Sequence, residues 1–443
     1  MAQYILILNN QLFDYKYYTK IDKKCTYIVY EHPYFFKKFK KTHKLKIAYH
    51  RAAMRYYFDH LPVKRKIYVN FNDDFNSILK NYKLSAGIMF NPIEKDLIKQ
   101  FKKLKFLDSP YFLNSSAVKM KNIRHDTFYK MQRRKYNILL HNNMPLFGQW
   151  SFDKENRMKF PGPIKEEIKI INNQYTREAI KYVDKYFKTN YGEINFIYPM
   201  TRKASLKWLS DFMDHKLRNF GKYEDAMHSE IMFGYHSVLS PMLNIGLITP
   251  HDVLKLFRQI KATKHNIATL EGFIRQIIGW REYNYVMYNM LTKKQFYNKN
   301  KNKLPNSVWR AKTDIKYIDD ILNKVNKYAY CHHIERLMGI GNYLLLLQIT
   351  AREIFKWFST MFIDAYEVFM IPNVYGMLLY GYVDKKHHMM TKPYFCSSNY
   401  IAKMSNYKKS DIIDKLYYEL LDKYKDKFAH IYSTANIIKT LSH

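Results

Sequence analysis

The hydrophobic pattern of this sequence changes near residue 140, and this change constrains the fold more than any other feature. Before it, short β-rich runs at 4–8, 26–30, 66–71 and 86–90 alternate with amphipathic stretches at 44–60 and 92–103. Strands separated by helices form parallel β–α–β units, so we expect a Rossmann-like parallel sheet. Beyond it almost every patterned stretch predicts a helix. The expected fold class is therefore an α/β domain followed by an all-α domain.

Turn-forming residues mark the border between the two patterns. Proline and glycine are concentrated at 144–163, which is typical of an irregular connection. We expect an α/β domain at 1–140, a linker at 141–175 and a helical domain at 176–443. The first strand is followed by Asn9, Asn10, Gln11 and Leu12 rather than by a glycine-rich turn. This argues against a nicotinamide or P-loop phosphate site.

Two stretches in the second half carry clear helix signals. Thr249 is placed to cap a helix that begins at Pro250, with Asp252 in its first turn. The stretch 266–283 places apolar residues along one face and, on another face, pairs Glu271 with Arg275 at the i,i+4 spacing.

Charge is the strongest compositional signal. The 443 residues include 74 Lys and Arg against 38 Asp and Glu, a formal net charge of +36. A protein this basic attracts polyanions, and nucleic acid is the partner that the charge favours. The alternative is a compositional bias that fills exposed positions with Lys, Asn and Tyr and creates no single binding face. Charge alone therefore names no function.

The cysteine spacing and the hydropathy pattern limit the cellular compartments in which we expect this chain. Cys25, Cys331 and Cys396 lie far apart without CxxC spacing, so they predict neither a disulfide framework nor a four-thiolate metal site. No apolar stretch reaches the ~18 residues of a membrane span, and no basic region precedes the first apolar run. We expect an intracellular monomer, cytoplasmic or DNA-associated, that is not secreted and has no membrane partner.

Six strings in the second half carry a resemblance. In chain order they are FGKYEDAM (220–227), HSVLSPMLNIG (236–246), EGFIRQIIGWREY (271–283), HHIERLMGIG (332–341), KWFSTMFIDAY (356–366) and PYFCSSNYIAKMS (393–405). Together they resemble the photolyase/cryptochrome flavoproteins, most closely the bacterial branch that carries an iron–sulfur cluster. The start of the chain and WSFDKENRMKFP (150–161) fit as well. The resemblance thus covers nearly the full length.

The resemblance implies an N-terminal antenna domain, a linker and a helical domain that holds FAD in a folded form, with the flavin supplying the chemistry. It assigns the phosphates to the serine-bearing turn at 236–240, where hydroxyls and backbone N–H groups are donors. It places Arg336 and Asp364 beside the isoalloxazine ring, although these two residues alone indicate an ordinary ion pair. The positions that match cofactor contacts are Tyr223, His236, Ser237, Leu239, Ser240, Arg275, Trp280, Arg281, Arg336, Asp364 and Met370.

The implied activity is light-driven repair of UV-induced pyrimidine dimers in DNA. Photoexcited, fully reduced FAD donates an electron to the dimer, the dimer rearranges or splits, and the electron returns to the flavin. The lesion has to leave the base stack, and its weakened pairing lowers the usual cost of a few kcal/mol. Basic residues around the pocket would hold the DNA backbone without reading its sequence.

Several aromatic and histidine positions match functional positions of the family. His333 falls where the family faces both flavin and lesion, and His332 matches its neighbour; a histidine there can supply a proton during (6-4) photoproduct repair. An isolated histidine would favour a structural role instead. Adjacent helical residues point about 100° apart, so the pair is not expected to chelate one metal. The other matches are Tyr394 and Tyr400 in the lesion pocket, Trp357 next to the flavin in the photoreduction chain, and Trp309 farther out.

Two departures from the family pattern concern bound groups. Lys408 and Asp411 stand where the iron–sulfur branch has its CxxC pair, so we expect no cluster and no metal. Asn10 replaces the antenna-site aspartate while Glu31 remains. A lumazine-like second chromophore therefore stays an open expectation.

Two further departures concern the reaction. Met370 stands where relatives have a polar residue opposite flavin N5, and a thioether is a poor hydrogen-bond partner there. Ile277 stands where other photolyases have a glutamate that contacts cyclobutane dimers. Together with the histidine pair, this modestly favours the (6-4) photoproduct as the substrate.

Three functions follow as alternatives. The first is a DNA photolyase, a carbon–carbon lyase whose partner is UV-damaged DNA, with the (6-4) photoproduct slightly favoured over the cyclobutane dimer. The second is a cryptochrome-type blue-light receptor without repair, which would tolerate Met370 best. The third is a DNA-coating or packaging protein. The lesion-pocket matches count against it, because a coat needs no pocket.

Overall fold

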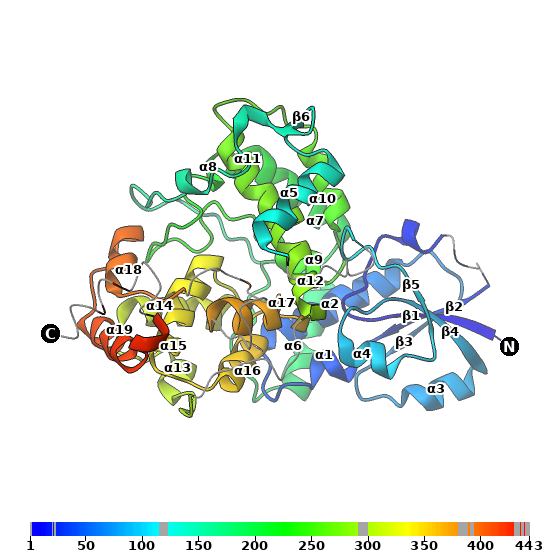
Figure 1. Cartoon of the computed structure of the whole chain (residues 1–443). Coiled ribbons are helices and arrows are strands. Elements are labelled where there is room, and N and C mark those ends of the chain that lie inside the picture. Colours follow the sequence, from blue (N-terminus) through cyan, green and yellow to red (C-terminus); the bar gives the residue numbers. More distant parts are fainter. Residues whose placement is uncertain are drawn as a thin grey trace.

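The computed structural model describes residues 2–19, 21, 24–114, 123–290, 300–379, 389, 394–428, 435 and 438. A sheet with its helices forms one end of the molecule, and helices form the remainder (Figure 1). The predicted fold class, an α/β part followed by an all-α part, is confirmed. In the described part of the chain, no helix is long and apolar enough to cross a membrane.

The sheet has five parallel strands in the order β3-β2-β1-β4-β5. Residues 4–8 are all buried, because helices cover both faces of a parallel sheet, and this explains the unbroken apolar run. The three-residue strand β5 was not predicted from the sequence. The strands are β1 (Ala2–Ile7), β2 (Thr26–Tyr30), β3 (Lys66–Val69), β4 (Leu84–Phe90) and β5 (Lys105–Leu107).

Short helices connect the strands. The predicted helix at 92–103 is shorter in the structure, because Ile93 has a φ of 69° and the helix starts only at Lys95. The predicted helix at 44–60 has the expected ends, and His43 caps it by accepting from the backbone N–H of Leu45. The elements are η1 (Tyr15–Tyr17), α1 (Pro33–Phe36), α2 (Lys44–His60), α3 (Phe75–Asn81) and α4 (Lys95–Gln100).

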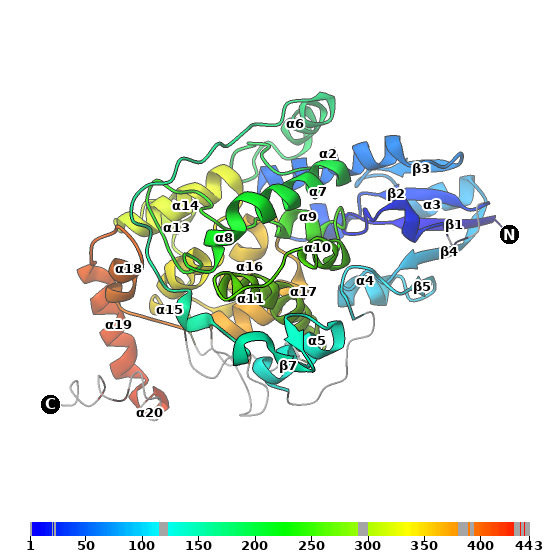
Figure 2. The ribbon, with the colours of Figure 1, turned by 90° about the horizontal axis from the view of Figure 1, so that it is seen from above.

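Irregular chain leads from the sheet to the helical part, as the proline and glycine content predicts. It holds a small hairpin, β6 (Leu140–His141) with β7 (Met144–Pro145), and two 3-10 turns, η2 (Leu146–Gly148) and η3 (Asp153–Glu155). The helix α6 (Gln174–Tyr186) ends this connection and packs along α2 (Figure 2). The predicted domain boundaries remain a prediction. One helix before them, α5 (His125–Tyr136), packs against the helical part.

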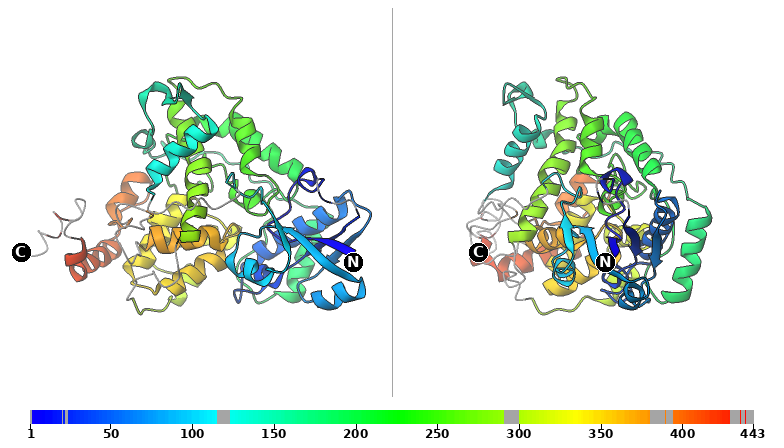
Figure 3. Two further views of the ribbon diagram at one scale, coloured as in Figure 1. Left: turned by 45° about the vertical axis from the view of Figure 1, so that its right-hand side comes forward. Right: turned by 90° about the vertical axis from the view of Figure 1, so that its right-hand side faces the viewer.

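The helical part begins after α6, and α19 lies at the end of the molecule opposite the sheet (Figure 3). Thr249 caps α10 as predicted, since its N–H donates to Asp252 at 2.8 Å. A break at Tyr424 separates the last two helices, α19 and α20. The helices are α7 (Arg202–Asp211), α8 (Leu217–Phe220), α9 (Ser240–Asn244), α10 (Pro250–Phe257), α11 (Ile267–Ile274), α12 (Glu282–Met290), α13 (Asn306–Arg310), α14 (Lys316–Tyr328), α15 (Asn342–Leu346), α16 (Ala351–Met361), α17 (Glu367–Met370), α18 (Ser398–Met404), α19 (Asp411–Lys423) and α20 (Lys425–Phe428).

Four π-helical segments interrupt these helices in the described residues. They are η4 (Phe212–Lys216), η5 (Arg275–Arg281), η7 (Glu335–Gly341) and η8 (Ile371–Leu378). The predicted single helix at 266–283 is consequently α11, then η5, then the start of α12. A π-turn holds an extra residue and rotates the following side chains, and such segments occur frequently at functional sites.

Candidate functional site

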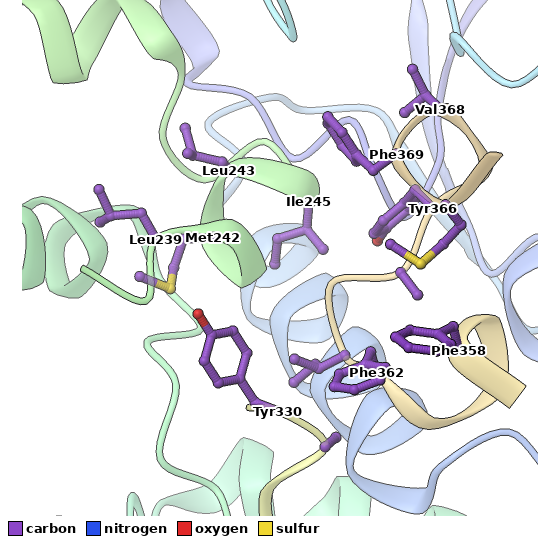
Figure 4. Packing of buried hydrophobic residues seen from close by; sticks show 14 of the residues in the cluster. Leu239, Met242, Leu243, Ile245, Tyr330, Phe358, Phe362, Tyr366, Val368 and Phe369 are labelled. Carbon is purple, nitrogen blue, oxygen red and sulfur yellow. The ribbon is translucent and has the colours of Figure 1, made fainter. Parts of the chain in front are cut away.

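A cavity of about 300 Å³ lies in the helical part, within the size range of cofactor pockets. Its wall comes from the turn before α9, from α9 itself and from the three π-helical segments η5, η7 and η8. Figure 4 shows part of the surrounding core, with Leu239 and Leu243 near α9 and Phe358 and Phe369 from later helices. The predicted site residues on this wall are His236, Ser237, Leu239, Ser240, Trp280, Arg281, His333, Arg336, Asp364 and Met370.

An ion pair and a serine form one side of the cavity. Arg336 holds both oxygens of Asp364, with Nη1–Oδ1 at 2.9 Å and Nη2–Oδ2 at 3.1 Å. Ser240 donates its hydroxyl to the same Oδ2 at 2.5 Å. Although burial opposes it, Asp364 raises the pKa of Arg336, so the guanidinium stays charged. The pair that the residues alone indicate therefore exists, and it lies on the cavity wall.

The serine-bearing turn is held from behind. Trp208 donates its indole N–H to the carbonyl of Ser237 at 2.8 Å. Val238 has a φ of 51°, a left-handed conformation that turns the chain into α9. The turn can thus present polar groups to the cavity without relying on its own side chains for support.

His333 faces the cavity and is exposed there. Protein surrounds the ring on its other sides, and this burial, together with Arg336 and Arg275, lowers its pKa to about 4. At neutral pH the side chain is a neutral imidazole. It can carry one N–H proton but no second one, which limits it as a proton source on its own.

The second predicted histidine lies behind the wall. His332 stacks on His236 with ring centroids 4.5 Å apart, and only His236 lines the cavity. Burial lowers the pKa of both well below the ordinary value. In the described residues, Nε2 of His236 and Nδ1 of His332 are buried without a hydrogen-bond partner.

Trp280 and Arg281 lie side by side on η5. The outer face of Trp280 is covered by His125, which stacks on it at 3.7 Å. Arg281 donates from Nη1 to Asn244 at 2.7 Å and lies over the ring of Phe369, and burial lowers its pKa. Its Nε is buried without a partner in the described part of the chain, so it can still donate to a ligand.

Besides His332, five of the predicted tyrosines and tryptophans do not line the cavity. Tyr223 stacks on Phe160 in a separate small cluster, and Trp309 stacks on Tyr191. Trp357 is buried behind Phe358, which does line the cavity. The remaining two, Tyr394 and Tyr400, are half-buried side chains near Arg157 and Asp225.

Arg275 also lies off the cavity wall. Its guanidinium is held by Glu271 at 3.1 Å, as the i,i+4 spacing predicts, and by Asp153 at 3.0 Å. The Arg275–Glu271 pair is buried, so it supports the structure around η3 and η5 rather than an exposed helix face. Its charge is compensated within the protein.

The structure adds cavity residues that the sequence did not point to. These are polar side chains set among apolar neighbours: Glu224, Gln276, Asn284 and Asn373. The sequence signal that could have identified two of them is their position next to recognised residues. Glu224 lies inside the FGKYEDAM string, and Asn284 follows Arg281 by three residues, so both are near recognised positions.

One of the two predicted antenna residues, Glu31, is fully engaged by the protein's own groups. The carboxylate of Glu31 is fully buried and accepts from Arg51, Tyr68 and Tyr182 at 2.6–2.8 Å and from a backbone N–H. Asn10 is buried and donates to the carbonyl of Pro92 at 3.1 Å. Neither residue lines the cavity. The Oδ1 atom of Asn10 has no hydrogen-bond partner among the described residues, and the second chromophore stays a prediction.

Metal-ligand geometry is absent from the part of the chain that the structure describes, since no three His, Cys, Asp or Glu side chains gather there as a metal site. Burial raises the pKa of the Cys396 thiol to about 12 and that of Cys331 well above its ordinary value, so both stay protonated.

Comparison with known proteins agrees with this geometry. The model of the family described as "Deoxyribodipyrimidine photo-lyase-related protein" matches residues 5–198. A (6-4) photolyase from Agrobacterium fabrum is 35% identical over 311 residues, which is 68% of this chain and 61% of that protein. The chain thus spans less than two thirds of this relative's length.

Two solved structures share the fold. A bacterial class III photolyase from Agrobacterium tumefaciens matches with a TM-score of 0.58 and 14% identity, over 91% of this chain and 84% of that chain. A cryptochrome from Synechocystis matches with a TM-score of 0.58 and 12% identity, over 97% of this chain and 88% of that chain.

Proposed function

This chain belongs to the photolyase/cryptochrome family, and from this premise we propose that it is a light-dependent DNA photolyase that uses FAD to repair UV-induced pyrimidine dimers. The observation that carries the proposal is the cavity with the Arg336–Asp364 pair on its wall. A DNA-coating protein would need no such cavity.

The donor set of the cavity fits a flavin dinucleotide. The aromatic side chains of Phe358, Phe369 and Trp280 supply flat apolar surface. The guanidinium groups of Arg281 and Arg336 supply charged hydrogen-bond donors. Among the described residues, the Nε atom of Arg281 and the Nε2 atom of His236 are buried and have no hydrogen-bond partner. Planar apolar surface next to unused donors is what an isoalloxazine ring with a diphosphate requires.

When bound, reduced and excited by light, the flavin supplies the electron for repair. The residues of this chain do the binding and orienting. Ser240 and Arg336 hold Asp364 so that its carboxylate can accept from a ring N–H, and Arg336 places positive charge where an anionic ring needs it. His333, neutral at pH 7, can pass on its single N–H proton and has to be reprotonated from elsewhere.

DNA is the proposed partner. The net charge of +36 supports binding to the phosphate backbone, which carries no sequence information. The (6-4) photoproduct is the favoured lesion, since Ile277 on the cavity wall offers no hydrogen bond to a cyclobutane dimer and His333 faces the cavity. We also propose that an intracellular, DNA-containing compartment is its place of action.

The test uses the purified protein loaded with FAD. Oligonucleotides that carry either one (6-4) photoproduct or one cyclobutane dimer are illuminated with the protein and then analysed for restored bases. We expect repair of the (6-4) substrate, and loss of that repair in His333→Ala without loss of binding to undamaged DNA. A flavin-loaded sample that repairs neither lesion would rule out the photolyase proposal.

A cryptochrome-type receptor is the second candidate. The observation that favours it is Met370 on the cavity wall, because a thioether hydrogen-bonds poorly to a flavin nitrogen and this changes how the flavin accepts electrons. A sample that binds FAD and responds to blue light but leaves both lesions intact would support this candidate. A colourless protein that still binds DNA would support a coating role.

A further inference from the structure

Six charged side chains gather beside the cavity, and we call them the Arg275 cluster. Four are carboxyl groups and two are guanidinium groups, so ionising all four acids would leave two uncompensated negative charges. Uncompensated buried charge is costly, and buried acids usually take up protons instead. The cluster consists of Asp153, Arg157, Glu224, Asp225, Glu271 and Arg275.

Hydrogen bonds show which acids the two guanidinium groups hold. Asp153 accepts from Arg275 at 3.0 Å and from Arg157 at 2.6 Å. Burial alone would raise its pKa, but these two guanidinium groups hold it below the ordinary value. Glu271 accepts from Arg275 at 3.1 Å and from the backbone N–H of Phe152 at 3.0 Å. The Nε and Nη1 groups of Arg275 and the guanidinium of Arg157 are therefore committed to these two acids, whereas Nη2 of Arg275 has no hydrogen-bond partner among the described residues.

Glu224 has weaker partners. Its oxygens accept from the amide groups of Gln276 at 2.8 Å and Asn156 at 3.2 Å, and Nη2 of Arg275 is 3.8 Å away. Its side chain is 12% exposed. Burial, reinforced by Asp225 and Asp153 and opposed by Arg275, raises its pKa to about 8.

Glu224 is the member of the Arg275 cluster that lines the cavity. The other charged lining groups are Arg281, Arg336 and Asp364, and the histidines on the wall are neutral. With Glu224 protonated, the wall carries one net positive charge, and with Glu224 ionised it carries none. One proton thus decides whether the cavity attracts an anion.

We propose that the cavity binds its anionic dinucleotide only together with a proton held on Glu224. This rests on the proposed function, in which the ligand is FAD with its two phosphate charges. Because the ionised carboxylate repels these charges, raising the pH above the midpoint of Glu224 removes the ligand. Glu224 is a positioning residue: it holds the proton that accompanies ligand binding, and it takes no part in electron transfer.

The test is equilibrium binding of FAD to flavin-depleted protein between pH 7 and pH 9, followed by flavin fluorescence. For the wild type, the Kd should rise about tenfold per pH unit above 8. Glu224→Gln, which mimics the protonated acid in shape and charge, should bind with a Kd that is flat over this range. Asp225→Asn removes a charge that helps to raise the pKa of Glu224, so the same slope should begin at a lower pH than in the wild type.

Riboflavin, which has no phosphates, provides the second arm, and its Kd should not depend on pH in the wild type. A pH slope that persists in Glu224→Gln, or an equal slope for riboflavin, would overturn the proton linkage while leaving the flavin site intact. Wild-type protein that binds no FAD even at pH 7 would instead overturn the proposed function.

Discussion

Asp364 shows at the scale of one residue how the cavity wall is organised. Its carboxylate holds both Nη groups of Arg336 and the hydroxyl of Ser240, and its backbone carbonyl accepts from Asn244 at 2.8 Å. Three segments far apart in sequence therefore meet at one residue. The sequence predicted both charged residues, and the structure brings them to the same wall.

Replacing Asp364 by Asn should cost about 3 kcal/mol of unfolding free energy, because it leaves the charge of Arg336 without its carboxylate in a buried place. Urea unfolding followed by circular dichroism measures this. The exposed i,i+4 pair Lys207–Asp211 is the control, and Asp211→Asn should change stability by less than about 0.5 kcal/mol. Equal losses in the two variants would contradict a structural role of the buried pair.

Among the elements, the connection between sheet and helical part is held at several points, and one of them is Glu166. The carboxylate of Glu166 accepts from three consecutive backbone N–H groups, those of Met232 at 2.5 Å, Phe233 at 2.9 Å and Gly234 at 2.8 Å. Consecutive N–H groups that point to one side form an anion site, and here the linker itself fills it. This contact fixes the chain just before the serine-bearing turn.

Glu166→Ala should therefore loosen the linker. We expect a loss of about 2 kcal/mol, since three donors lose a charged acceptor, and faster hydrogen exchange of the amides at 232–234. The neighbour Glu167 is exposed and pairs only with Lys169, so Glu167→Ala is the matched control and should leave these amides unchanged. Unchanged exchange in Glu166→Ala would contradict the anchoring role.

The π-helical segments are the elements that the sequence did not predict. The stretch 266–283 has the apolar periodicity of one α-helix, and its i,i+4 charge pair agrees with that interpretation. One extra residue in a helical turn does not visibly change the hydrophobic pattern, because apolar side chains neighbour it in both the α-helical and the π-helical conformation. Tertiary packing selects the π-helical conformation, which places Gln276, Trp280 and Arg281 on the cavity wall.

For the molecule as a whole, burial makes many histidines resist protonation. Burial lowers the pKa of His32, His43 and His333 to about 4 and that of His50 and His125 to about 3. In the unfolded chain these rings have a pKa near 6.5. As the pH falls below 6.5, the unfolded state therefore takes up protons first, and the folded state loses relative stability until about pH 4.

Urea unfolding at pH 7, 6 and 5 should show a falling midpoint. Each such histidine contributes about 1.4 kcal/mol per pH unit, and the histidines outnumber Glu94 and Glu224, whose raised pKa acts in the opposite direction. His43→Asn keeps a capping side chain at the start of α2. It should reduce the pH dependence of the unfolding free energy by about 1.4 kcal/mol per pH unit. The exposed His60→Asn should leave it as in the wild type. A midpoint that does not change with pH would contradict this account.

The sequence by itself determined the parallel sheet, most helices and the family, because periodicity, caps and ordered strings are local or linear properties. Only the tertiary structure decided which predicted residues share one cavity. It placed His333, Arg336 and Asp364 on the wall, His332 behind it, and Arg275 in an ion cluster beside it. It also showed Glu31 saturated by its own neighbours and Glu224 facing the cavity. The physical reason is that burial and partner charges set a group's protonation and availability, and these depend on segments that meet only when the chain is folded.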